Sequence, residues 1–166
     1  HAYFGDLHVH TENSFDAYSF GTTASPADAY KYARGEAIKH PTGYLIQLSR
    51  PLDFYAVTDH GIFLGLMKEA SNPASEIGQY ELTKPLHNLN EEVSNSIISI
   101  IRRAGIFRPF AQKLAENIQD GTIDMKLLEK VSSDVWFKTI KAADQAYVPG
   151  IFTTFAAYEY LSLIHI

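Results

Sequence analysis

Three short apolar and aromatic segments, each followed by histidine or carboxylate side chains, constrain the fold of this chain most strongly. Residues 2–9, 52–58 and 151–158 each have the length and composition of a buried β-strand. Helical patterns separate these segments, one near residues 25–35 and several between residues 88 and 146. The order strand, helix, strand, helices, strand predicts an α/β fold with a largely parallel sheet or barrel.

The clearest helix signal begins at Ser25. A serine at this place can cap a helix, Pro26 fits the first turn, and Asp28 is favoured at the positive end of the helix dipole. Gly35 is expected to end the helix. The residues before it, 11–23, are rich in Asn, Ser, Asp and Gly and are expected to form a loop.

The middle of the chain, about residues 70–148, is expected to form a helical insert. One helix is predicted to start with Asn90 as its cap and to end before Gly105. Further helices are predicted over residues 109–118 and 124–146. Nothing in this insert identifies a ligand.

Composition excludes several classes of protein. With 46% apolar and 20% charged residues, the chain has enough apolar material for a globular core. The net charge of -5 gives no sign of a nucleic-acid partner, and no apolar run approaches the ~18 residues of a membrane-spanning helix. The absence of cysteine excludes disulfides, thiolate metal ligands and cysteine nucleophiles. No targeting segment is seen, and both bacterial periplasm and cytoplasm stay open.

The segment Asp6-Leu7-His8-Val9-His10 carries the most chemical information. Alternation along a strand is expected to place Asp6, His8 and His10 on one face. Two imidazoles one strand repeat apart can converge on a single ion. The alternative is a pair of surface histidines on a half-exposed strand, but the apolar neighbours indicate a buried strand, where unpaired polar groups are costly.

The other two strand segments end in the same kind of residue. Asp59 and His60 follow the second segment, and Glu159 follows the third. Ligands of α/β proteins gather at the carboxyl ends of parallel strands, so these side chains are expected to meet those of the first segment. Asp16, in the loop after the first strand, could reach the same place. Taken singly, each has an ordinary reading as a cap, a turn former or a surface residue.

Together these residues predict a metal site. Imidazole and carboxylate ligands suit Zn, Mn or Fe, and such an ion can lower the pKa of a bound water from ~15.7 to about 7. Asp6 and Asp59 are expected to act in catalysis by orienting imidazoles or carrying protons. The expected metal ligands are His8, His10, Asp16, His60 and Glu159.

With these residues in view, the chain resembles the PHP (polymerase and histidinol phosphatase) superfamily of metal-dependent phosphoesterases. Its closest likeness is to a PHP-like bacterial group, domain-of-unknown-function family 3604. The resemblance runs from the first residues to about Tyr160 and lies in residues 3–11, 14–17, 52–61 and 149–159.

The resemblance implies a distorted (β/α)7 barrel holding two or three divalent ions. His8 and His10 would bind one ion, Asp16 and His60 would contribute to a neighbouring one, and Glu159 would bridge them. The spacing from His10 to Asp16 is one residue longer than in many superfamily members.

The superfamily completes its site with further histidines and an Asp-x-His motif near the end of the barrel, and this chain stops before any such late motif. Residues 1–160 are therefore expected to be the N-terminal part of one such domain, inactive by itself. Residues 161–166 fit the pattern poorly and are expected to be a non-native tail, so that His165 is not counted as a ligand.

The expected function is hydrolysis of a phosphate or related small-molecule ester by metal-activated water. One alternative is an amidohydrolase, which also begins with His-x-His on its first strand, although Asp59-His60 fits the PHP pattern better. The other is a metal-binding domain without catalysis, or an incomplete one. Substrate, metal identity and oligomeric state stay open.

Overall fold

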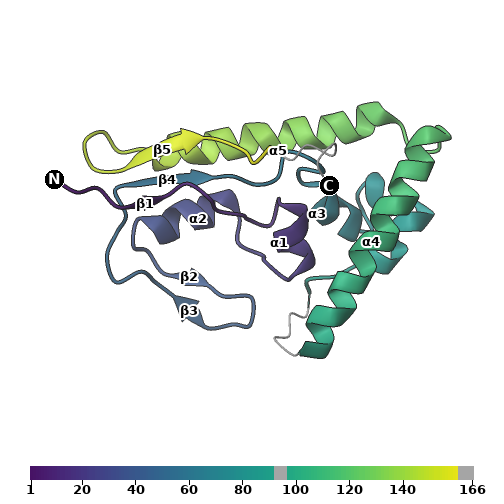
Figure 1. Ribbon diagram of the computed structural model, residues 1–166, viewed down its shortest axis with the longest axis horizontal. Helices are drawn as coiled ribbons and strands as arrows, with labels where there is room; N and C mark the ends of the chain where they lie inside the picture. The colour runs from purple at the N-terminus through teal and green to yellow at the C-terminus, as the bar shows by residue number, and fades with distance from the viewer. Residues whose placement is uncertain (92–96, 161–166) are drawn as a thin grey trace.

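The structure, a computed structural model, describes residues 1–91 and 97–160 (Figure 1). It has a mixed α/β fold built on a parallel sheet of three strands in the order β1–β4–β5. The strands are β1 (Gly5–Asp6), β4 (Phe54–Val57) and β5 (Thr153–Ala156). A separate antiparallel pair, β2 (Ile38–Lys39) and β3 (Leu45–Ile46), forms a hairpin beside the sheet. The predicted α/β class with a parallel sheet is confirmed.

The register of the sheet aligns the ends of its strands. Phe54 pairs with Gly5 on one side and with Thr153 on the other. Beyond the strands proper, His60 and Glu159 form one more parallel bridge. Because all three strands run in the same direction, the residues that follow them collect at one edge of the sheet.

Strand β1 differs from its prediction in length and burial. Regular pairing covers only Gly5–Asp6, whereas a strand over residues 2–9 was expected. Phe4 and Leu7 are 68% and 54% exposed, so the expected burial is wrong. Among the described residues β1 pairs only with β4, and its other edge is open to solvent.

Helices α2 (Pro26–Ala33) and α5 (Met125–Ala146) pack on the sheet, and Figure 1 shows α5 lying along β5. Small alanine side chains on both helices allow close approach to the strands. The α2 start is as predicted: Ser25 and Asp28 form a reciprocal capping box. Gly35 follows the helix with a φ of 80°, a left-handed conformation that favours glycine. The buried residues of this layer are Ala29, Tyr30, Ala33, Tyr55, Val57, Ala142, Ala143, Ala146 and Phe152.

A second core lies between the short helices and α4. Its elements are α1 (Phe15–Ser19), α3 (Leu66–Ser71), the 3-10 helices η1 (Ile77–Gln79) and η2 (Glu81–Leu86), and α4 (Ile97–Gln119). Met67, Leu86 and Leu114 are buried within it. Helix α1 falls in a segment expected to be a loop. The helix is short and lies among polar residues, so the sequence shows no helical pattern there. Its apolar contacts with the core come from Phe15 and Tyr18.

Helix α4 is continuous where the sequence predicts an end before Gly105 and a new start at Pro109. Both residues lie on the exposed side, while Phe110 and Leu114 are buried and hold the helix in place. Packing therefore outweighs the helix-breaking tendency of proline and glycine. The side chain of Asn90, expected as a cap, donates to the Tyr18 carbonyl and accepts from Arg103.

Within residues 1–91 and 97–160, no helix has the length and apolar character needed to cross a membrane. The expected non-native tail, residues 161–166, lies outside the described residues.

Candidate metal centre

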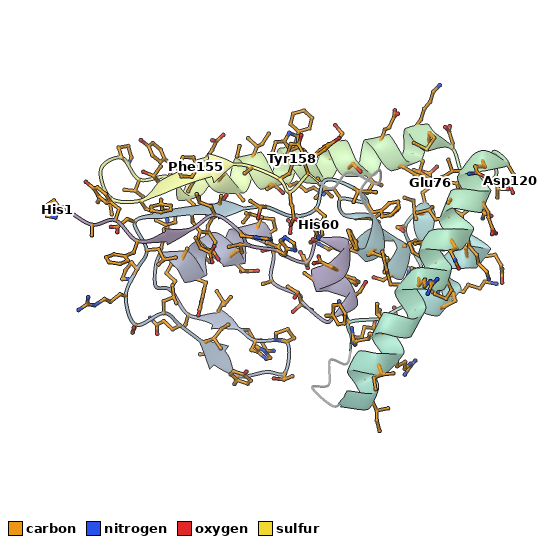
Figure 2. The ribbon with its side chains drawn as sticks, in the orientation of Figure 1. His1, His60, Glu76, Asp120, Phe155 and Tyr158 are labelled. Atoms are coloured by element: carbon orange, nitrogen blue, oxygen red, sulfur yellow. The ribbon has the colours of Figure 1, made fainter. Side chains whose placement is uncertain are left out.

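The ends of the three parallel strands bring histidines and carboxylates together. His8 and His10 follow β1, His60 follows β4 and Glu159 follows β5. Asp16 joins them from the first turn of α1. Figure 2 shows the His60 side chain between α1 and the ends of the strands. All five residues expected as metal ligands therefore lie in one cluster.

Glu159 is the centre of this cluster. Its Oε2 atom lies 2.8 Å from His10 Nε2, 3.2 Å from His8 Nε2 and 3.5 Å from His60 Nδ1. Strand alternation turns the preceding side chain the other way: the Tyr158 ring packs edge-on against Trp136 of α5. One carboxylate oxygen is thus faced by nitrogens of three imidazoles.

Asp16 faces two of these three imidazoles, those of His10 and His60, from the opposite side. Its Oδ2 atom lies 3.0 Å from His10 Nδ1 and 3.4 Å from His60 Nε2. His10 and His60 therefore each stand between Asp16 and Glu159. A neutral imidazole carries one N–H and can donate to only one of two carboxylates. The second nitrogen needs a cation, either a proton or a metal ion, between it and the other carboxylate.

The geometry of the cluster fits metal binding. Two groups have their ligand atoms within 4.8 Å of one another: His8, His10 and Glu159 form one, and His10, Asp16 and His60 form the other. An ion at about 2.0–2.1 Å from its ligands separates neighbouring ligand atoms by roughly 3.0–3.4 Å, close to the distances above. His60 Nδ1 is buried and has no hydrogen-bond partner among the described residues. Imidazole with carboxylate is a ligand set for Zn, Mn or Fe.

Aromatic stacking holds His60 in this position. Its ring stacks on Phe15 with centroids 4.7 Å apart, and Phe15 stacks in turn on Phe107 of α4 at 4.9 Å. The imidazole is buried at the end of this stack, so its plane is fixed before any ligand binds. The stack could not be predicted from the sequence, because Phe107 lies in α4, far along the chain from Phe15 and His60.

Ser14 is a residue of the site that sequence analysis missed. Its hydroxyl donates to Asp16 Oδ1 at 2.5 Å and accepts from the backbone N–H of His60 at 3.2 Å. Burial by itself raises the pKa of Asp16. Hydrogen bonds from Ser14 and the Ala17 N–H, together with nearby His10, lower the pKa by more than burial raises it. The net effect is a pKa below the ordinary aspartate value, which keeps the carboxylate ionised near neutral pH.

Asp59 is buried beside the cluster and bonds to Thr11. One carboxylate oxygen accepts from the Thr11 N–H at 2.5 Å and the other accepts from its hydroxyl at 2.7 Å. Burial raises the pKa of Asp59, and these two hydrogen bonds oppose the rise. Asp59 thereby ties the loop after β1 to the end of β4. Its catalytic role stays a prediction.

Asp6 lies apart from the cluster. It pairs with Tyr55, whose side chain packs on the α2 and α5 side of the sheet. Its carboxylate accepts from the His8 N–H at 2.9 Å, at a bend that interrupts strand alternation. Asp6 belongs to neither of the two ligand groups, and both its shared face with His8 and His10 and its role in catalysis stay predictions.

Comparison with known proteins confirms the resemblance to domain-of-unknown-function family 3604. A family model described as "Protein of unknown function (DUF3604)" matches residues 1–165, which include every residue of the cluster. Neither the curated proteins nor the solved structures contain a significant match to the chain. The chain belongs to the DUF3604 family.

Proposed function

We propose that this DUF3604 protein is a metal-dependent hydrolase acting on phosphate or related esters of small molecules. The observation that carries the proposal is the position of His10 and His60, each held between the carboxylates of Asp16 and Glu159. Each neutral imidazole has one N–H to donate, but a carboxylate faces both of its nitrogens. The acceptors in the cluster therefore outnumber the protons that the two imidazoles can donate. Two divalent cations would satisfy them.

The residues divide between two ions in a definite way. His8, His10 and Glu159 form the group that would hold one ion, and Asp16 and His60, grouped with His10, would hold a neighbouring one. If His10 binds through Nε2, its Nδ1–H is free to donate to Asp16, which is the usual way in which a carboxylate orients a metal-binding imidazole. When bound, the ions would supply Lewis acidity that makes hydroxide available at neutral pH.

Access and charge favour a small anionic substrate. His8 is the exposed member of the cluster, with 73% of its side chain open to solvent, while His60 is buried. Substrate would therefore approach from the His8 side. The two carboxylates carry less charge than two divalent ions, so the loaded site would remain positive and attract a phosphate ester.

We also propose that the family belongs to the PHP superfamily and that its complete domain is a distorted β/α barrel. The support is the small parallel sheet with ligands after three neighbouring strands, the edge at which β/α barrels carry their active sites. Strand β1 has an open edge among the described residues, where a further strand of a barrel could pair.

The test is metal removal and restoration. The complete protein, rather than residues 1–166 alone, would be stripped with a chelator and then supplied with Zn²⁺, Mn²⁺ or Fe²⁺ singly, with p-nitrophenyl phosphate and bis-p-nitrophenyl phosphate as substrates. We expect hydrolysis to disappear on stripping and to return with at least one ion. An amide and a lactone, tested in parallel, separate an amidohydrolase from a phosphoesterase. Tight metal binding without turnover of any of the four substrates would instead support a non-catalytic metal-binding domain.

A further inference from the structure

We propose that Ser14 is a positioning residue that restricts Asp16 to a single metal-facing oxygen. The inference rests on the proposed metal site but adds a residue and a role that the ligand set does not contain. It follows from three features of the Ser14 hydroxyl: the bond that it does not make, the oxygen that it occupies, and the second ligand that it reaches.

The first feature is a missing cap. Ser14 occupies the N-cap position of α1, with extended backbone angles, yet its side chain makes no capping hydrogen bond. Serine at this position ordinarily accepts from an N–H of the first turn. Ser25, at the same position of α2, does so by accepting from the Asp28 N–H. The Ser14 hydroxyl is therefore turned from its own helix toward the cluster.

The second feature is the oxygen that the hydroxyl occupies. Asp16 Oδ1 receives the Ser14 hydroxyl at 2.5 Å and the Ala17 N–H at 2.7 Å. These two donors use the lone pairs of Oδ1, although His10 Nδ1 also lies 3.2 Å from it. Oδ2 is closer to His10, at 3.0 Å, and is the oxygen that faces His60. Asp16 is thus set to offer one oxygen to an ion.

The third feature is the link to the second loop. The same hydroxyl accepts from the His60 N–H at 3.2 Å and lies 3.4 Å from His10 Nδ1. Ser14 is fully buried, with 0% of its surface exposed, so water does not compete for these bonds. One hydroxyl therefore joins the loop after β1 to the end of β4 and sets the spacing between Asp16 and His60.

The experiment is Co²⁺ titration of the metal-free protein, followed by visible absorption, which reports both affinity and coordination. Removal of groups that orient metal ligands typically weakens metal binding about 10- to 100-fold, and we expect Ser14→Ala to fall in this range. We also expect its absorption bands to shift, because Asp16 would gain freedom to bind through both oxygens. Ser25→Ala is the matched control: it removes a true cap and should leave Co²⁺ affinity and spectrum unchanged.

The outcomes separate this inference from the proposed function. Wild-type protein that binds no Co²⁺ would overturn both. Wild-type binding with an unchanged Ser14→Ala affinity and spectrum would overturn only the role of Ser14, as would equal losses in Ser14→Ala and Ser25→Ala. If circular dichroism shows that Ser14→Ala is unfolded, Ser14→Gly decides. Glycine is also favoured at the start of a helix but lacks the hydroxyl, so affinity below wild type supports the inference and wild-type affinity overturns it.

Discussion

The Nδ1 atom of His60 lies 3.5 Å from Oε2 of Glu159, is buried, and has no hydrogen-bond partner among the described residues. The two residues meet because they form a parallel bridge just beyond β4 and β5. Leaving a buried polar atom unsatisfied costs about 1–3 kcal/mol. An ion bound to His60 through Nε2, on its Asp16 side, would leave the imidazole proton on Nδ1, facing Glu159. The relationship between His60 and Glu159 is therefore a structural mark of a ligand site.

Replacement of Glu159 tests this relationship. Glu159→Gln keeps the shape of the side chain but removes the charge and puts an amide where three imidazole nitrogens converge. We expect bound metal, measured by plasma mass spectrometry after dialysis, to fall by more than about tenfold. Glu12→Gln is the control, because Glu12 lies near His10 in the chain but pairs with Lys68 instead. Equal metal content in Glu159→Gln and Glu12→Gln would contradict a role for Glu159 in binding.

The pair formed by Asp59 and Thr11 should stabilise the folded protein. Asp59→Asn places an amide against one of the two Thr11 donors and should lower the free energy of unfolding by about 1–3 kcal/mol. Urea unfolding of Asp59→Asn, Thr11→Val and the double variant gives their coupling. We expect an interaction energy of about 0.5–3 kcal/mol, the range for residues in direct contact. Strictly additive effects would show that the hydrogen bond from the Thr11 hydroxyl to Asp59 does not stabilise the fold.

Pro109 should weaken α4, because proline inside a helix lacks an N–H and crowds the carbonyl four residues earlier. Pro109 is exposed, so Pro109→Ala loses no buried contact. We expect Pro109→Ala to raise the free energy of unfolding by up to about 3 kcal/mol, measured by urea denaturation.

Gly105→Ala is a second test of the same helix. An added Cβ meets no atom within 4 Å there, so this variant should raise the free energy of unfolding by about 0.5–1 kcal/mol. A loss of stability in both variants would indicate two helices rather than one.

Tyr55 should make stability fall at alkaline pH. Burial raises the pKa of Tyr55 to about 12, whereas an unfolded tyrosine ionises near pH 10. Between these two values the unfolded chain loses the proton and the folded chain keeps it, so the unfolded state gains stability as the pH rises. We expect the Tyr55 contribution to be complete below about pH 10 and lost as the pH passes about 12.

The measurement for Tyr55 is the ultraviolet absorbance of tyrosinate during alkaline titration of wild type and Tyr55→Phe. The difference between the two should titrate near pH 12 in the folded protein. In denaturant it should titrate near pH 10. A folded-state difference that also titrates near pH 10 would show that Tyr55 is not buried as described.

Sequence patterns predicted the parts of the fold that local chemistry determines. The α2 helix has a capping serine, a first-turn proline and a terminal glycine, and each acts within a few residues. Strands β4 and β5 lie within the predicted apolar segments. Helix α4 could not be predicted in the same way, because burial of Phe110 and Leu114 against distant helices overrides the signals of Gly105 and Pro109.

The candidate site shows the same division. His10, His60 and Glu159 could be grouped from the sequence because residues after parallel strands meet at one edge of a sheet. The hydrogen bond from the His8 N–H to the Asp6 carboxylate could not be predicted, because it forms at a bend that follows β1. Ser14 looks like an ordinary loop residue in the sequence, and only three-dimensional contacts show that its hydroxyl bonds to Asp16 and to the backbone of His60.

The most direct test of the proposed function is a double variant of the complete protein, His8→Ala with His60→Ala, assayed for bound metal and for ester hydrolysis in the same preparation. The control is His1→Ala with His40→Ala, two histidines outside the ligand cluster. We predict that the first variant loses metal and hydrolysis together, while the control keeps both. Full hydrolysis by the His8→Ala, His60→Ala variant, with or without its metal, would contradict a metal-dependent hydrolase centred on this site.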